Sequence, residues 1–282
     1  MKSRARSAGV RAQNDIPKFR RVVWAHYKKS GRHDLPWRTN NDPYRILVSE
    51  VMLQQTQVDR VIPFYERFLK EFPTAADLAR TPLSKVLKNW QGLGYNRRAK
   101  MLQQAAKDIV GRFENRFPQS VEEIESLSGV GPYTARAVAA FAFNQDVPVI
   151  ETNVRTVIIH YFFPKKKKVS DTEIEKILIQ ALPKKRSREW YSALMDYGSY
   201  LKRSGISHNA RTKQYTKQSK FSGSLREVRG AILRLLADGS ATKKRIEGLF
   251  RVSRRTQILE ALAALLVEGL VRVKGSTYSL AD

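Results

Sequence analysis

The sequence predicts a mainly helical protein that ends in a small winged helix–turn–helix domain. Apolar residues recur every three or four positions from Ile16 to Tyr200, which is the spacing of amphipathic helices. A turn with two glycines, LSGVGPYTA (residues 127–135), separates two of these helices. After a polar stretch at 202–224 the helical spacing returns at Leu225, and the chain closes with a β-hairpin pattern. These observations place a helical body before a separate C-terminal domain.

The helices of the body are marked by their periodicity and by the loop residues between them. Phe19, Val23 and Tyr27 share one face of the first helix, and the segment 34–38 ends it. Pro43 suits the first turn of the next helix, where its missing N–H would have no partner in any case. Further helices are expected at 58–72, 83–90, 99–113, 121–127, 133–143, 154–162, 171–182 and 189–201.

The C-terminal domain is expected to contain three helices and a hairpin. The helices are expected at 225–237, at 243–250 with Thr242 as the N-cap, and after Ser253 as the N-cap. The hairpin strands are expected at 270–273 and 277–280. Six cations lie where such a domain meets a DNA duplex: Lys243, Lys244, Arg245, Arg251, Arg254 and Arg255. A winged helix can also bind proteins, and the sequence leaves this choice open.

Composition limits the partners and the compartment. The chain of 282 residues has 52 Lys and Arg against 26 Asp and Glu, a net charge of +26, which favours a polyanionic partner such as nucleic acid. It has no cysteine, which excludes disulfides and cysteine-bound clusters, and its four histidines lack zinc-site spacing. No apolar run is long enough to span a membrane. We expect a cytoplasmic, nucleoid-associated monomer whose residues 1–14 form a disordered basic arm.

The glycine turn suggests a phosphate site. Gly129 and Gly131 can form a hairpin too tight for residues with a Cβ atom, and the N–H groups of the following helix would point toward its ligand. We expect Val130, Tyr133 and Thr134 to complete this hairpin. A carboxylate and an amide, Glu151 and Asn153, follow at a short interval. The alternative is an ordinary corner between helices with a surface glutamate.

Several segments resemble MutY-type adenine DNA glycosylases. The resemblance is carried by LPWRTNNDPYRILVSEVMLQQTQVDRVIPFYERFLKEFPT (35–74), GLGYNRRAK (92–100), LSGVGPYTA and the segment ending in ETNV, and it runs from about Phe19 to Tyr200. It implies the two-lobed helix–hairpin–helix glycosylase fold. Residues 15–41 and 146–222 would form one helical lobe, and residues 42–145 a six-helix barrel lobe. The winged helix–turn–helix domain, residues 223–282, follows from the sequence pattern and not from the resemblance.

The resemblance also implies catalytic roles. Glu50 would protonate the flipped purine at N7, and burial between Val48 and Val51 should raise its pKa; a buried ion pair is the alternative role. Glu151 stands where the family has aspartate and would stabilise the oxocarbenium-like sugar. Asn153 would hydrogen-bond to Glu50 or to the catalytic water. Tyr133 occupies the position of the Schiff-base lysine of bifunctional relatives, so no lysine-dependent strand cleavage is expected.

Other matched residues concern the flipped base. Gln54, Gln55 and Tyr95 resemble the residues that probe the helix and fill the gap as the base leaves. The glutamines could instead form ordinary helix-surface hydrogen bonds. Trp37, Arg38 and Leu53 match positions that line the base pocket, although Trp37 fits a core equally well.

Two features depart from the family pattern. The cysteines of the usual four-iron cluster would fall at Lys202, Asn209, Thr212 and Gln218, so no iron–sulfur cluster is expected. The loop 202–221 should instead fold on neighbouring helices and direct its cations at phosphate. The winged helix stands in place of the family's 8-oxoguanine-reading domain. The sequence leaves open whether a monovalent cation joins the hairpin to phosphate.

The expected partner is double-stranded DNA that contains a mismatch or a damaged base. The resemblance implies hydrolysis of the N-glycosidic bond of adenine mispaired with 8-oxoguanine or guanine, which leaves an abasic site. One alternative is a thymine or uracil glycosylase that acts on G:T and G:U mismatches. Another is a non-catalytic DNA-binding regulator that works through the winged helix.

Overall fold

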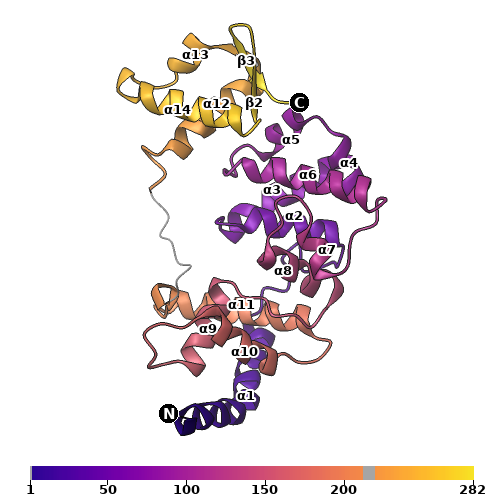
Figure 1. The fold of residues 1–282 in the computed structure, drawn as a ribbon, viewed down its shortest axis with the longest axis vertical. Helices are drawn as coiled ribbons and strands as arrows, with labels where there is room; N and C mark the ends of the chain where they lie inside the picture. Colours follow the sequence, from indigo (N-terminus) through magenta and orange to yellow (C-terminus); the bar gives the residue numbers. More distant parts are fainter. Residues whose placement is uncertain (1, 212–219) are drawn as a thin grey trace. The chain divides into compact units, whose positions relative to one another are not determined.

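The computed structural model describes residues 2–211 and 220–282, except for the side chains of residues 2–14 and 209. It confirms the mainly helical fold and the small C-terminal sheet that the sequence predicts (Figure 1). The chain divides into two compact units. Unit 1 comprises Met1–Ile46, Gln119–Glu125 and Gly131–Lys217, and unit 2 comprises Leu47–Pro118, Ser126–Val130 and Gln218–Asp282. No helix of the described part is long and apolar enough to cross a membrane.

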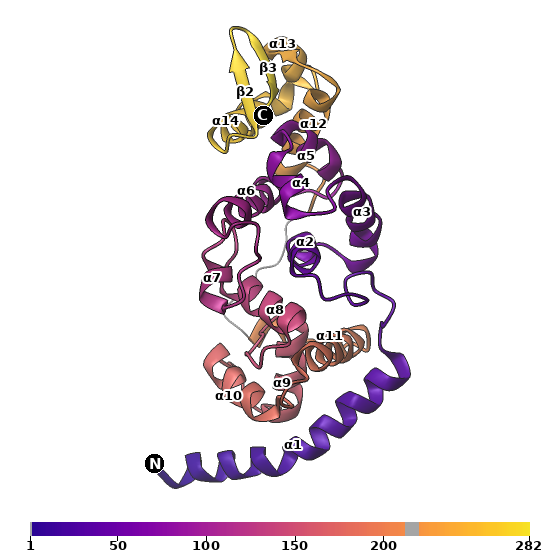
Figure 2. The same cartoon turned by 90° about the vertical axis from the view of Figure 1, so that its right-hand side faces the viewer.

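Unit 1 is a bundle of helices around one aromatic and aliphatic core. Its helices are α1 (Lys2–Ser30), α7 (Val121–Glu125), α8 (Pro132–Phe143), α9 (Thr152–Phe162), α10 (Asp171–Ala181) and α11 (Ser187–Arg203). Helix α11 packs against α1, α8 and α9, as Figure 2 shows. Trp190 and Tyr191 of α11 are fully buried, and the ring of Phe19 meets that of Trp190 edge-on, with 5.8 Å between centroids.

The N-terminal segment differs from the expectation. Residues 2–14, predicted as a disordered arm, continue helix α1 in the structure. Alanine, arginine and glutamine in this segment favour a helix, which gives a local physical reason for the extension. Pro17 lies inside the helix and supplies no backbone N–H to it.

A buried carboxylate ties the loop after α1 to helix α11. The Asp196 side chain is 2% exposed and accepts hydrogen bonds from the backbone N–H and guanidinium of Arg32 and from the guanidinium of Arg38. Burial alone would raise the pKa of Asp196, but the hydrogen bonds and charges of Arg38 and Arg32 outweigh it and lower that pKa. This cluster therefore fixes the loop 31–42 on unit 1.

The first part of unit 2 contains the C-terminal half of α2 (Pro43–Leu53) and the next four helices: α3 (Val58–Glu71), α4 (Ala75–Arg80), α5 (Leu83–Trp90) and α6 (Arg97–Arg112). Its core includes Phe68 and Trp90, whose rings meet edge-on at 5.7 Å. Helix α4 was not expected, because six residues are too few to show a periodicity. Thr74 starts it with a capping box that it shares with Asp77.

The second part of unit 2 is the winged helix domain. It contains α12 (Leu225–Asp238), β1 (Ala241–Thr242), α13 (Lys243–Glu247), η2 (Val252–Arg254), α14 (Arg255–Val267), β2 (Val271–Lys274) and β3 (Thr277–Leu280). The antiparallel sheet has the order β1-β3-β2. Thr242 caps α13 as expected. The prediction that Ser253 caps the last helix is wrong, because Ser253 lies in the 3-10 turn η2 and the N-cap is Arg254.

The winged helix domain is anchored to the helices of unit 2. The Gln91 side chain donates a hydrogen bond to the Leu233 carbonyl at 3.0 Å, and Lys100 donates to the Glu268 carbonyl at 2.6 Å. Helix α12 packs on α5. The sequence pattern predicts residues 223–282 as a separate domain, and the family resemblance predicts a barrel lobe that starts at residue 42. The contacts group the winged helix with the barrel helices, and α8 with α7 and α11.

Replacement of Asp196 should reveal a pH-dependent contribution to stability. A carboxylate whose folded pKa is lowered stabilises the fold above its ordinary pKa of about 4, and the effect is lost as the pH falls through the folded pKa. Asp196→Asn should therefore lower the free energy of unfolding by about 3 kcal/mol at pH 7, and by progressively less below pH 4. Urea denaturation from pH 7 to pH 3 measures this difference.

Asp238→Asn is the matched control, because Asp238 is exposed. It should leave the unfolding free energy within about 0.5 kcal/mol of the parent. A difference between the parent and Asp196→Asn that stays constant down to pH 3 would contradict the role given to the two arginines.

Candidate active site and DNA-probing loops

Glu50 lies in helix α2 among apolar side chains. Glu50 is 7% exposed, and Val48 and Val51, close to it in the sequence, are buried as well. Pro43 begins this helix, and the residues that follow it are largely apolar. The expected burial is confirmed. A carboxyl group that is shielded from water in this way is a candidate general acid.

Glu151 is the N-cap of helix α9. Its Oε1 atom accepts hydrogen bonds from the backbone N–H groups of Asn153 at 2.7 Å and Val154 at 2.8 Å. Its Oε2 atom accepts from the Asn153 amide at 3.2 Å and from the Thr152 hydroxyl at 3.1 Å. The longer side chain of glutamate thus folds back onto its own helix. Asn153, expected to bond to Glu50 or to water, donates to Glu151 in this structure.

Helix α11 approaches the Glu151 segment closely. A Cβ atom on Gly198 would lie 2.4 Å from the Asn153 carbonyl oxygen, so only glycine allows this contact. Lys202 follows one turn later and is half-buried. Burial lowers the pKa of Lys202, and the negative charge of Glu151 raises it in part. A cation therefore faces the carboxylate at the first position where relatives would carry a cluster cysteine.

The described residues after Lys202, 203–211, fold on unit 1. Ile206 packs against the core, and Arg211 donates to the carbonyls of Phe163 and Lys166. No cysteine exists in the chain, and Lys202 and Asn209 cannot bind iron as thiolates do, so the residues do not fit the cluster. Thr212 and Gln218 lie outside the described residues. In the described part, no group of three or more His, Cys, Asp or Glu side chains could hold a metal ion.

The expected probing residues occupy two strained turns of unit 2. Gln55 has φ +56° and Tyr95 has φ +49°, both in the left-handed region that non-glycine residues rarely adopt. Gly92 and Gly94 beside Tyr95 have φ +93° and +81°. Each non-glycine residue in this region costs about 1–2 kcal/mol, which other contacts must offset. Such strain gathers at sites where side chains are presented for a function.

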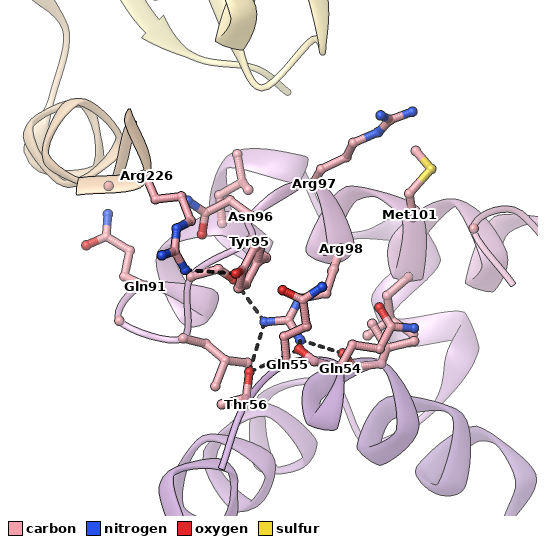
Figure 3. Close-up of a pocket in the computed structure, with 18 of the residues that line it drawn as sticks. Gln54, Gln55, Thr56, Gln91, Tyr95, Asn96, Arg97, Arg98, Met101 and Arg226 are labelled. Atoms are coloured by element: carbon pink, nitrogen blue, oxygen red, sulfur yellow. Dashed lines mark hydrogen bonds between the residues drawn. The ribbon is translucent and has the colours of Figure 1, made fainter. Parts of the chain in front are cut away.

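Arg98 supplies those contacts. It donates to the carbonyls of Val51 at 2.7 Å, Met52 at 3.0 Å and Gln54 at 2.7 Å. It also donates to the Gly94 carbonyl at 3.1 Å and the Thr56 hydroxyl at 3.3 Å. Figure 3 shows this guanidinium between the two turns. Arg98 thereby joins three parts of unit 2: the peptide group before Gln55, the peptide group before Tyr95, and the C-terminal end of α2, the helix that carries Glu50.

The charge of Arg98 is maintained in this position. Burial lowers the pKa of Arg98 to about 10, an effect that Tyr95 reduces, so the guanidinium stays protonated at neutral pH. Sequence reasoning did not select Arg98, although GLGYNRRAK contains it. Three of its four target carbonyls lie 44 to 47 residues away along the chain, and no local pattern indicates them.

The hairpin glycines differ in their roles. Gly129 has φ +76°, and a Cβ atom there would lie 2.4 Å from the Cβ of Met101. Gly131 has φ −103°, and a Cβ atom there would meet nothing within 4 Å, so the expectation that it also needs to lack a Cβ is wrong. Gly131 is the N-cap of α8, which carries no side-chain cap, and Pro132 follows at N1. Val130 is buried behind the turn.

The remaining expected site residues differ in their burial and in their contacts. The guanidinium of Arg38 binds Asp196 at 2.7 Å and holds its loop in place, and Trp37 is half-buried in the same loop. Leu53 is the half-buried last residue of α2. Tyr133 packs against the core of unit 1, and Thr134 is 3% exposed. Glu50 and Leu53 belong to unit 2. The other expected site residues of this paragraph, together with Glu151 and Asn153, belong to unit 1.

Comparisons with known proteins identify the family. The family model for the HhH-GPD superfamily of base excision DNA repair proteins matches residues 48–184. An adenine DNA glycosylase from Mycolicibacterium smegmatis is 34% identical over 258 residues, which cover 85% of this chain and 88% of that protein. The chain belongs to the MutY-type adenine DNA glycosylases of this superfamily. The adenine DNA glycosylase of Mycobacterium tuberculosis (strain H37Rv) is 46% identical over 135 residues, 48% of this chain and 44% of that protein.

Other comparisons cover a smaller share of this chain or of the matched protein. The chain spans about half, 52%, of an adenine DNA glycosylase from Buchnera aphidicola subsp. Baizongia pistaciae, at 36% identity over 65% of the chain. Among solved structures, a thermostable thymine-DNA glycosylase aligns with a TM-score of 0.61 and 27% identity over 68% of this chain and 88% of that chain. Endonuclease III in a non-covalent DNA complex aligns with a TM-score of 0.57 and 21% identity, over 67% of this chain and 86% of that chain, and supports the fold alone.

The two hairpin glycines provide a matched pair of variants. Gly129→Ala should lower the free energy of unfolding by about 2–4 kcal/mol, because the methyl group meets Met101 and the left-handed φ is strained. Gly131→Ala should change it by less than about 0.5 kcal/mol, since its φ suits alanine and the space is open. Urea denaturation compares the two. Equal losses for both variants would overturn this account of the turn.

Proposed function

We propose that this protein is a monofunctional adenine DNA glycosylase. It would hydrolyse the N-glycosidic bond of adenine mispaired with 8-oxoguanine or guanine and leave an abasic site. The observation that carries this proposal is the burial of Glu50 in the helix whose last turn Arg98 joins to the probing turns. Family membership supports the same activity.

The chemistry requires one acid and one anion. Glu50 would donate its proton to N7 of the extruded adenine, so that the electron pair of the breaking C–N bond leaves with a neutral base. The sugar then carries the positive charge of an oxocarbenium ion. The Glu151 carboxylate, aligned by Asn153 and the N-terminus of α9, would stabilise that charge. Water adds to the sugar carbon and loses its proton, which restores Glu50.

Strand cleavage is not part of this proposal. The position that carries the Schiff-base lysine in bifunctional relatives is Tyr133, and a phenol cannot form an imine with the abasic sugar. The product would therefore be an intact strand with an abasic site.

Duplex DNA would be bound through charge and through backbone N–H groups. The net charge of +26 supports a long phosphate footprint and a location on the nucleoid, where the protein would act as a monomer. At the N-terminus of α8, Gly131 offers no side-chain cap, which suits that end of the helix to a phosphate.

A second candidate function is removal of thymine or uracil from G:T and G:U mismatches. The likeness to a thymine-DNA glycosylase, with a TM-score of 0.61 and 27% identity, favours it. Because both activities use the same fold, the two candidates are distinguished by which base the protein releases.

Single-turnover release of the base from four duplexes tests the proposal. The wild type should release adenine opposite 8-oxoguanine and guanine, and neither thymine nor uracil opposite guanine. Glu50→Gln should slow adenine release by about 10²–10⁴-fold and retain DNA binding, because the amide keeps the shape of the side chain but cannot donate the proton.

Glu66→Gln in α3 is the control, since that glutamate is exposed. Its rates should equal those of the wild type. Release of thymine alone would favour the second candidate, and unchanged adenine release by Glu50→Gln would remove Glu50 from its role.

A further inference from the structure

Unit 2 contains a pocket between the probing turns and the winged helix domain. Its volume is about 940 Å³, and Gln54, Gln55 and Tyr95 line one side. Helix α12 of the winged helix domain lines another side with Arg226, Arg229 and Arg234. Helix α12 lies outside residues 48–184, which the family model matches.

A direct contact joins the two sides. The Arg226 guanidinium donates a hydrogen bond to the Tyr95 hydroxyl at 2.8 Å and lies 5.5 Å from the centre of its ring. The Arg98 guanidinium lies 5.3 Å from the same ring. Figure 3 shows Tyr95 between the two arginines. The winged helix domain thus helps to set the position of the residue expected to enter the DNA.

The pocket has the charge and the aromatic surface of a nucleotide site. Its lining carries six arginines and one carboxylate, Glu268, which Arg229 already binds at 2.6 Å. Arg97 and Arg234 are exposed at its edge. Phe221 is 62% exposed and adds a second aromatic ring, after that of Tyr95, to the lining of the pocket. Cations that meet phosphate and aromatic rings that stack on a base are the means by which proteins hold unpaired nucleotides.

We propose that this pocket binds an unstacked nucleotide of the strand opposite the target base, and that Arg226 and Phe221 make the winged helix side part of that site. The phosphate would lie against Arg97 and Arg234, and the base against Tyr95 and Phe221. The side-chain amides of Gln54 and Gln55 would meet the edge of the base. This inference deepens the proposed function, on which it rests.

Binding to two matched duplexes tests the inference without any base release. Both carry a tetrahydrofuran abasic analogue at the target position. The opposite nucleotide has guanine in one duplex and no base in the other. Fluorescence anisotropy should show that the wild type binds the duplex with guanine about tenfold more tightly, because a stacked base contributes on this scale.

Arg226→Met and Phe221→Ala should each bring this ratio close to one. Phe221→Ala carries little risk to the fold, because its side chain is largely exposed. Lys274→Met, on the exposed wing, is the control for loss of one charge. It should weaken binding to both duplexes equally and preserve the ratio.

The outcomes separate this inference from the proposed function. A wild-type ratio near one, or a tenfold ratio that survives both Arg226→Met and Phe221→Ala, would overturn the nucleotide site. Because the abasic analogue cannot be cleaved, a protein that shows the expected ratios but releases no adenine would instead contradict the proposed function.

Discussion

The buried guanidinium of Arg98 is the constraint on which the candidate chemistry of unit 2 depends. It binds the end of the helix that carries Glu50 and the peptide groups that precede Gln55 and Tyr95. Gln55 and Tyr95, the residues expected to probe DNA, adopt left-handed backbone conformations that oppose folding. One rigid, always charged fork can hold them in place because it offers several donors at fixed angles. The site is therefore arranged before DNA arrives.

The regular elements could be predicted from sequence because they depend on local periodicity. The helices, the wing strands and the Thr242 cap follow from spacing and from single residue types, and the burial of Glu50 follows from its apolar neighbours. Contacts across long sequence distances could not be predicted. The partner of Arg38, Asp196, lies 158 residues away, and no pattern in the sequence connects them. The Asn153 bond to Glu151 depends on rotamers, which a motif does not fix.

The absence of cluster cysteines and the presence of the winged helix, the two departures from the family pattern, each have a structural counterpart. In unit 1, Ile206 and Arg211 tie the segment after α11 to the core and to the loop after α9, where relatives would use thiolates and iron. In unit 2, α12 contacts the Tyr95 turn, which connects the winged helix domain, outside residues 48–184 of the family model, to a turn expected to probe DNA. Both changes supply local positioning through arginine hydrogen bonds.

Base extrusion tests the role of Arg98 most directly. A duplex with 2-aminopurine as the target base opposite guanine becomes more fluorescent when that base leaves the stack. The wild type and Lys107→Met, an exposed position on the same helix, should produce the full increase. Arg98→Met and Arg98→Lys should bind this duplex within about threefold of the wild type by anisotropy, because Arg98 faces carbonyls and not phosphate, yet lose most of the increase. The full increase from both Arg98 variants would contradict the account.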